Sequence, residues 1–373
     1  MALPTKKILI FLLLSGILTF SSCHIARYVF WNYADINDYK RFPADTLITG
    51  MPAYPFYPYS LPYKLILPES FQTTQCPQDL ENFLESTHTK VFLIIRNDSI
   101  IYEKYFDDYN HMSLLPGFSI AKSFLSALVG IAIDEGFIKS TSQPVTDFIP
   151  EMKDTGFQKV TIDDLLSMRS GIRFVEGYSN PFSGVAKFYY GRNLRKYSVN
   201  LKVVSTSGNA YNYQSANYQL LAMIIEKATG KRVSEYLEEK IWKPVGMEFP
   251  GTWNYDSKKF MENKGFCCIN ARAVDFARFG ELYLNGGILN DQRIISKDWV
   301  DASLNNRYNS LDSQGFPYTY SWRVLANGDF FAKGILGEYI YVSPAKKIII
   351  VRIGTKAGDL IWPQFFQGII SQI

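Results

Sequence analysis

Histidine and cysteine are scarce in this sequence, which contains only three of the first and four of the second. No Cys-x-x-Cys pair and no His-rich stretch offers the spacing that structural zinc sites use. The sequence also has little excess positive charge, because its formal net charge is +4 and its Lys and Arg residues cluster only in short pairs. A basic nucleic-acid-binding face is therefore excluded. We expect no metal, no organic cofactor and no nucleic acid partner.

The sequence also lacks a long N-terminal apolar run. Residues 8–20 form an apolar stretch shorter than the roughly 20 residues of a spanning helix, with two lysines before it, as in a signal peptide. Two serines then precede Cys23, an arrangement that resembles a bacterial lipobox, although Leu is usual where Phe20 stands. We predict a signal peptide over 1–22 and acylation of Cys23, which would hold an exported chain at the periplasmic or outer-envelope face of a membrane. A plainly cleaved signal and an uncleaved anchor are the alternatives.

Proline and tyrosine mark the segment that follows. Residues 23–75 are rich in both, and the prolines forbid a regular helix there. We predict a tether and a wrap across the surface of one domain, residues 76–373. With Cys23 acylated, three cysteines remain, so at least one is unpaired or pairs between chains. The pairing of Cys76, Cys267 and Cys268 stays open, as does the oligomeric state.

Periodic segments predict the architecture of that domain. Two β-rich runs flank Asn97-Asp98 and indicate a hairpin, and an apolar helix is expected from Ser119 to about Glu135. Strands near both chain ends with helices between them predict an α+β fold. It would hold an antiparallel sheet built from both ends, flanked by helices, with a helical insertion from about 140 to 305. The other expected elements are β-like runs near 330 and at 338–342 and 347–353, and a helix within 360–373.

Ser119 and Lys122 are the candidate nucleophile and base. A serine hydroxyl needs a base to take its proton, and all three histidines precede Ser119, which excludes the order Ser, acid, His. Positions i and i+3 share one helix face, so Lys122 would lie beside Ser119. A lysine in an apolar helix is desolvated, which favours its neutral, proton-accepting form. The backbone N–H of Ser119, in the first helical turn, is free to bind an oxyanion.

The spacing Ser-x-x-Lys alone is weak, since roughly one or two matches occur by chance in a chain this long. Ser343 and Lys346 form a second match, but a proline lies between them at a strand end. The alternative for Lys122 is a surface lysine whose stem lies along the helix. The apolar residues around it favour the buried base.

Ser119-Ile120-Ala121-Lys122, opening an apolar helix, resembles the serine β-lactamase and penicillin-recognising hydrolase superfamily. The resemblance implies a β-lactamase-like fold. The family's second motif is a Tyr followed two residues later by Ser or Asn, and Tyr213 and Ser215 match it, with Asn217 and a helix beyond. By this resemblance Tyr213 shares the proton transfers with Lys122, while Ser215 and Asn217 contact substrate. A phenol near an ammonium ionises more easily. The alternative is that Tyr213 only packs.

The family's third motif, Lys-Thr-Gly beside the serine, is altered here. Aligning on Gly334 puts Ala332 where the Lys belongs. The resemblance implies that Ile335 N–H is the second oxyanion donor and that Gly334 and Gly337 lie against substrate. Gly334-x-x-Gly337, followed by an acidic residue and a Tyr, looks closer to the 6-aminohexanoate-dimer hydrolases and related esterases than to true lactamases. Glu176 and Tyr178 resemble part of a cleft-lining segment and either contact substrate or lie on a solvated loop.

These residues together predict an exported serine hydrolase that cleaves a small ester or amide through an acyl-enzyme on Ser119. The alternative enzyme is a peptidoglycan D,D-peptidase or a β-lactamase, which the predicted location would suit. The absence of a lysine at position 332 argues against it. A non-catalytic cell-envelope binding protein of the same fold is the alternative from another class.

Overall fold

The structure, a computed structural model, describes residues 24–32, 34–60, 63–72 and 79–373. The predicted signal peptide, Cys23 and Cys76 lie outside the described residues. Within the described part of the chain, no helix is both long enough and apolar enough to cross a membrane.

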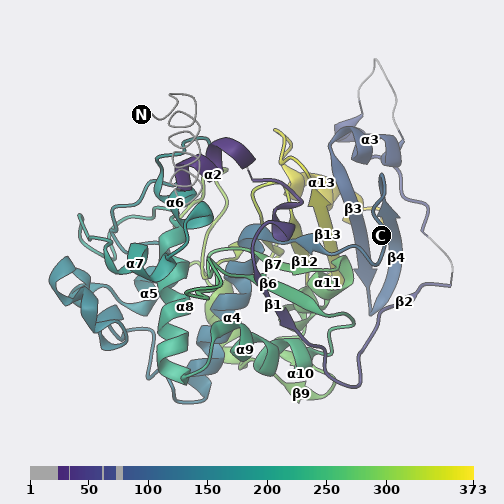
Figure 1. The fold of residues 1–373 in the computed structure, drawn as a ribbon. Coiled ribbons are helices and arrows are strands. Elements are labelled where there is room, and N and C mark those ends of the chain that lie inside the picture. The colour runs from purple at the N-terminus through teal and green to yellow at the C-terminus, as the bar shows by residue number, and fades with distance from the viewer. Residues whose placement is uncertain (1–23, 33, 61–62, 73–78) are drawn as a thin grey trace, which may run out of the picture.

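The main sheet draws its strands from both ends of the chain, as predicted (Figure 1). Its order is β10-β11-β12-β13-β3-β4-β2, and every pairing is antiparallel except that of β2 with β4. Asn97 and Asp98, both with positive φ, turn the predicted hairpin between β3 and β4. The strands are β2 (Tyr57–Pro58), β3 (Thr89–Arg96), β4 (Ser99–Tyr105), β10 (Arg323–Val324), β11 (Phe330–Lys333), β12 (Tyr339–Ser343) and β13 (Ile348–Gly354).

Both faces of this sheet are buried, because side chains alternate along each strand. On β3, Phe92 and Ile94 point into a smaller core with α3 (Leu80–Ser86) and the predicted C-terminal helix, α13 (Trp362–Ile370). Val91, Leu93 and Ile95 point into the larger core, which contains α4 (Ala121–Asp134) and α11 (Ala273–Leu284). Helix α11 packs directly on β12 and β13. The sheet is therefore the middle layer of three.

The expected helical insertion is wrong in one respect, because it also contains strands. Its strands β6 (Gly251–Asn254) and β7 (Ile269–Ala271) form a second sheet of order β1-β6-β7-β5 with β1 (Ala44–Leu47) and β5 (Leu115–Pro116). Segments this short leave little periodicity to detect. The hairpin β8 (Ile288–Leu289) and β9 (Gln292–Arg293) lies there as well. The helices are α5 (Ile162–Leu166), α6 (Gly184–Tyr190), α7 (Leu194–Val199), α8 (Ser215–Thr229), α9 (Val233–Leu237), α10 (Lys243–Val245) and α12 (Lys297–Leu304).

The segment before residue 76 is more structured than a tether. It begins with helix α2 (His24–Trp31), which packs on α6 (Figure 1), and it supplies β1 and β2 to the two sheets. The expectation of no helix fails because the first proline after Cys23 is Pro43, so nothing in 24–31 interrupts helical hydrogen bonds. Cys267 and Cys268, neighbours in sequence, form a disulfide with an S–S distance of 2.03 Å.

Candidate active site

Ser119 lies in a tight turn between the two sheets. It is the middle residue of a 3-10 turn, Phe118–Ile120, that runs directly into α4, so the predicted helix begins two residues later than expected. Phe118 has φ of +43°, a conformation that non-glycine residues rarely adopt and that is enriched at functional sites. Just before it, Gly117 N–H donates to Ile269 O at 2.9 Å, which fastens the turn to β7. The serine is half-buried, whereas its neighbours in the turn are buried.

Lys122 is held beside Ser119 by a short network. Its Nζ lies 3.0 Å from Ser119 Oγ and donates to Phe266 O at 2.6 Å. The side chain is only 2% exposed, and this burial lowers its pKa from 10.5 to about 7. The charge of Glu176 opposes that shift and the charge of Arg323 reinforces it. A neutral amine that donates to Phe266 O keeps its lone pair for the serine proton.

Tyr213 completes the group. It stands two residues before α8, which packs on α4, and its side chain lines the same cavity as Ser119. Lys122 Nζ is 5.1 Å from the centre of the Tyr213 ring. Burial raises the pKa of Tyr213 to about 12, although the Arg323 charge works in the other direction. The expectation of an easily ionised phenol is therefore wrong, because desolvation outweighs the nearby cation. At neutral pH Tyr213 is a proton donor.

Gly334 and Ile335 bring backbone close to the serine. A Cβ on Gly334 would stand 2.8 Å from Gly117 O and closer still to Glu338 Oε2, so only glycine fits between β11 and the Ser119 turn. The loop is closed by Gly334 N–H donating to Glu338 O at 2.8 Å and by Leu336 N–H donating to Glu338 Oε2 at 3.0 Å. Ile335 and Ser119 line the same two cavities. This placement is compatible with an oxyanion site between them.

The larger cavity is polar. Its volume is about 710 Å³, and Tyr213 and Gly334 line it together with Ser119. Arg323, only 5% exposed, donates from Nε to Asp312 Oδ2 at 3.1 Å, and Lys333 Nζ lies 3.4 Å from the same oxygen. One carboxylate thus faces two cations. Arg323, from the strand beside β11, provides positive charge near the place that Ala332 leaves without it.

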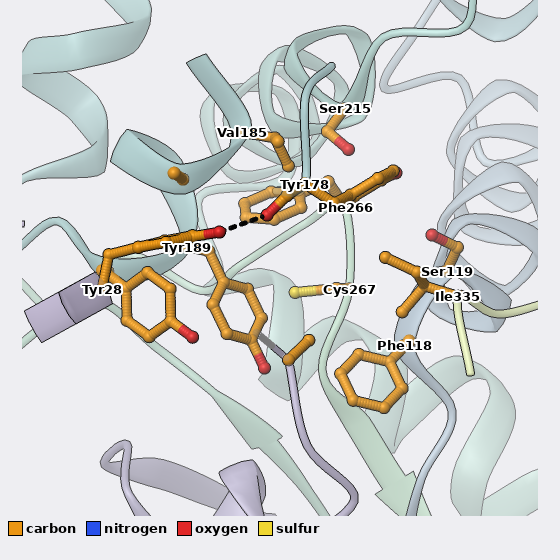
Figure 2. A pocket seen from close by; sticks show the side chains of 13 residues that line it. Tyr28, Phe118, Ser119, Tyr178, Val185, Tyr189, Ser215, Phe266, Cys267 and Ile335 are labelled. Carbon is orange, nitrogen blue, oxygen red and sulfur yellow. Dashed lines mark hydrogen bonds between the residues drawn. The ribbon is translucent and has the colours of Figure 1, made fainter. Parts of the chain in front are cut away.

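The smaller cavity is apolar and aromatic. Its volume is about 40 Å³, and Tyr28, from α2, lies across it from Ser119 and Ile335 (Figure 2). The remaining lining residues come from the segment after α2, the Ser119 turn, the loop before α6, α6 itself, the start of α8 and the disulfide segment. They are Ala34, Phe118, Tyr178, Val185, Ala186, Tyr189, Tyr190, Ser215, Phe266 and Cys267.

Of the other predicted substrate-binding residues, one lines a cavity beside Ser119 and two do not. Ser215 lines the small cavity, but its Oγ and N–H both donate to Glu176, at 2.6 and 2.7 Å. Asn217 is fully buried inside α8 and lines neither cavity. Its side-chain oxygen accepts a hydrogen bond from Ser170 Oγ, and its side-chain nitrogen donates to the Met168 sulfur. Gly337 also lies outside both cavities, and Arg352 donates to its carbonyl. The spacing of a motif fixes which helix face a residue shares with its neighbours, but not what that face packs against.

Sequence reasoning missed the roles of Arg323, Asp312 and Tyr28. Arg323 and Asp312 are 11 residues apart with no motif around them, and Tyr28 reaches the site only because α2 docks on α6. Glu176 carried a weak signal through the segment that resembles a cleft-lining loop. Its carboxylate accepts from Ser215 and also from the Tyr178 hydroxyl at 2.6 Å, so it orders the loop between the cavities.

Known proteins match this chain over most of its length. The family model for Beta-lactamase matches residues 80–360. The 6-aminohexanoate-dimer hydrolase of Paenarthrobacter ureafaciens is 29% identical in an alignment of 311 residues, and the match covers 76% of this chain and 76% of that one. A solved structure, "Putative 6-aminohexanoate-dimer hydrolase from Bacillus anthracis", superposes with a TM-score of 0.79 at 24% identity and covers 92% of this chain and 94% of that one. The penicillin binding protein from Bacillus halodurans superposes with a TM-score of 0.64 at 15% identity, covering 79% and 100%.

These similarities confirm the β-lactamase-like fold and the superfamily predicted from the Ser119 and Tyr213 motifs. The relatives of this fold include hydrolases, which supports hydrolysis as the class of reaction. Because the family model covers three quarters of the sequence, the chain belongs to the beta-lactamase family.

Proposed function

We propose that this chain is a serine hydrolase that cleaves an ester or amide bond through an acyl-enzyme on Ser119. The observation that carries the proposal is the buried Lys122 amine, 3.0 Å from Ser119 Oγ, with a pKa lowered to about 7. A structural lysine with no role would gain nothing from burial, because desolvation of its charge costs free energy.

The first half-reaction follows from the positions of three side chains. Ser119 Oγ attacks the carbonyl carbon while Lys122 Nζ takes the hydroxyl proton, and the N–H groups of Ser119 and Ile335 bind the oxyanion. Tyr213 gives its proton to the leaving alkoxide or amine as the carbon–heteroatom bond breaks, and the Lys122 ammonium restores that proton. The product is an ester of the substrate acid on Ser119.

The second half-reaction reverses these roles. Water takes the place of the leaving group, and the Lys122–Tyr213 pair removes one of its protons as the oxygen attacks the acyl carbon. Collapse of the tetrahedral intermediate returns a proton to Ser119 Oγ and releases the carboxylic acid. All proton transfers use groups of this chain and one water molecule.

The activity is tested by a screen of p-nitrophenyl esters, short amides and the β-lactam nitrocefin. We expect turnover of esters or amides and little or none of nitrocefin, because Ala332 lacks the cation of the family motif and the nearby Arg323 charge is paired with Asp312. Efficient nitrocefin turnover with poor ester cleavage would favour the β-lactamase or D,D-peptidase alternative. Absence of turnover, together with no covalent labelling of Ser119, would favour a binding protein.

We also propose that acylated Cys23 anchors the exported protein to a membrane. The support is the apolar run 8–20 followed by two serines and Cys23, directly before α2. In cells that carry out lipoprotein processing, Cys23→Ser should move the protein from the membrane fraction to the soluble fraction. Unchanged fractionation of this variant would contradict the anchor and leave the hydrolase proposal untouched.

A further inference from the structure

We propose that Tyr28 and Ala34, from the N-terminal part of the chain, form the end wall of an acyl pocket that admits only short apolar acyl groups. The preferred substrates are then esters or amides of small acids whose larger, polar part is the leaving group. This inference rests on the proposed acyl-enzyme at Ser119 and adds the substrate class to it.

The position of Tyr213 assigns the two cavities. The group that leaves must receive a proton, and Tyr213 is the half-buried phenol beside the base, with Lys122 Nζ 5.1 Å from its ring centre. Tyr213 lines the polar cavity and does not line the apolar one. The leaving group therefore occupies the polar cavity of about 710 Å³, beside Arg323 and Lys333. The acyl group, on the other side of the attacked carbon, enters the apolar cavity.

The volume of the apolar cavity limits the acyl chain. It measures about 40 Å³, and one water molecule needs roughly 10–15 Å³ on that scale. About three water-sized groups fit, which corresponds to an acyl chain of roughly two to four carbons. Its aromatic walls provide no charged side chain, so the acyl group should itself be apolar.

Several contacts hold the wall in place. Tyr28 OH donates to Tyr178 O at 2.9 Å, and its ring packs edge-on against Tyr190 at 5.7 Å between centroids. Arg27 donates to Tyr190 O at 2.7 Å, and Tyr190 OH donates back to Asn32 O at 2.6 Å. These bonds tie α2 and the residue after it to the last residue of α6 and to the loop before α6. The wall is therefore packed rather than loosely laid over the site, and a longer acyl chain cannot push it aside cheaply.

The wall belongs to a part of the chain that the family match does not include. Tyr28 and Ala34 precede residue 80, where the Beta-lactamase match begins. Acyl length is thus set by residues outside the matched segment, while the nucleophile and base lie within it. The same helix, α2, is described from His24 and docks on α6, so it links the residues next to Cys23 in sequence to the substrate pocket.

The test is the acyl-length profile of kcat/KM on p-nitrophenyl esters from acetate to octanoate. Wild type should fall by at least about tenfold between butyrate and octanoate, since one misfitting methylene can cost 10-fold or more. Tyr28→Ala should remove most of this drop, and Ala34→Leu should lower butyrate cleavage at least about tenfold while acetate cleavage persists. The matched control is Phe30→Ala on the same helix, whose side chain is 84% exposed and should leave the profile unchanged.

The outcomes are distinct. An identical length profile in wild type, Tyr28→Ala and Ala34→Leu would overturn the inference while leaving the hydrolase intact. Failure of wild type to cleave any ester or amide would instead overturn the proposed function itself. If Tyr28→Ala does not fold, as judged by circular dichroism, Ala34→Leu still tests the inference. The added side chain fills the cavity, and the substitution removes no contact that the fold needs.

Discussion

The pH dependence of acylation tests the role of Lys122 most quantitatively. An ordinary lysine has a pKa of 10.5, and burial lowers that of Lys122 to about 7. At pH 7 about half of the molecules would hold a neutral amine, against roughly one in 3,000 for an ordinary lysine. Burial thus increases the active base on the order of a thousand-fold.

The sign of the profile follows from which form is active. Because the neutral amine accepts the serine proton, kcat/KM should rise about tenfold per pH unit below pH 6, pass its midpoint near pH 7 and then level off. Tyr213 must stay protonated for activity. Because its pKa is about 12, the fall in kcat/KM that its deprotonation would cause lies above the pH range of the assay. The assay is kcat/KM on the best ester between pH 5 and 9.5, with the rate of spontaneous hydrolysis subtracted.

Two variants identify the titrating group. Lys122→Arg keeps a cation but supplies no base, so the rate should fall by at least about a hundred-fold at every pH. Lys333, with a pKa lowered to about 8 by burial, lies in the same cavity, and Lys333→Gln should keep the midpoint near 7 even if the rate changes. A wild-type midpoint above pH 9, or an active Lys122→Arg enzyme, would refute the reasoning.

Three further predictions concern the proton donor, the backbone and the pH dependence of stability. Tyr213→Phe should fold normally and lower kcat by about 10²–10⁴, measured in steady state, since only the leaving-group proton is lost. Gly334→Ala should lower stability by about 1–3 kcal/mol in urea unfolding and abolish turnover, because its Cβ would meet Gly117 O. Burial raises the pKa of Glu338 from 4.5 to about 8, so the stability that this carboxyl contributes is present at low pH and lost as pH rises towards 8. The wild-type free energy of unfolding should therefore fall more between pH 5 and 8 than that of Glu338→Gln, and equal pH dependence would contradict this.

Local patterns predicted the elements whose cause is local. The hairpin at Asn97-Asp98 needs only two β-rich runs and a turn, and α4 needs only an apolar stretch after Gly117. The pairing of Ser119 with Lys122 follows from helical spacing alone. These features depend on residues within one turn or one hairpin of each other, so the sequence displays them directly.

Contacts between distant segments could not be predicted in this way. Tyr28 meets Tyr178 across 150 residues, and β1 pairs with β6 across about 200, with no local signal for either. The pKa of Tyr213 was misjudged because its burial depends on the packing of several segments. The adjacency of Cys267 and Cys268 was visible in the sequence, but counting cysteines did not reveal their pairing.

The central claim is that Ser119 is a nucleophile, which would form a covalent bond with a serine-directed electrophile. Its most direct test is intact mass after exposure to a fluorophosphonate, followed by peptide mapping, on wild type and Ser119→Ala. The account predicts one adduct, on the peptide that contains Ser119, and none in the variant. An unlabelled wild type, or equal labelling of Ser119→Ala, would contradict it.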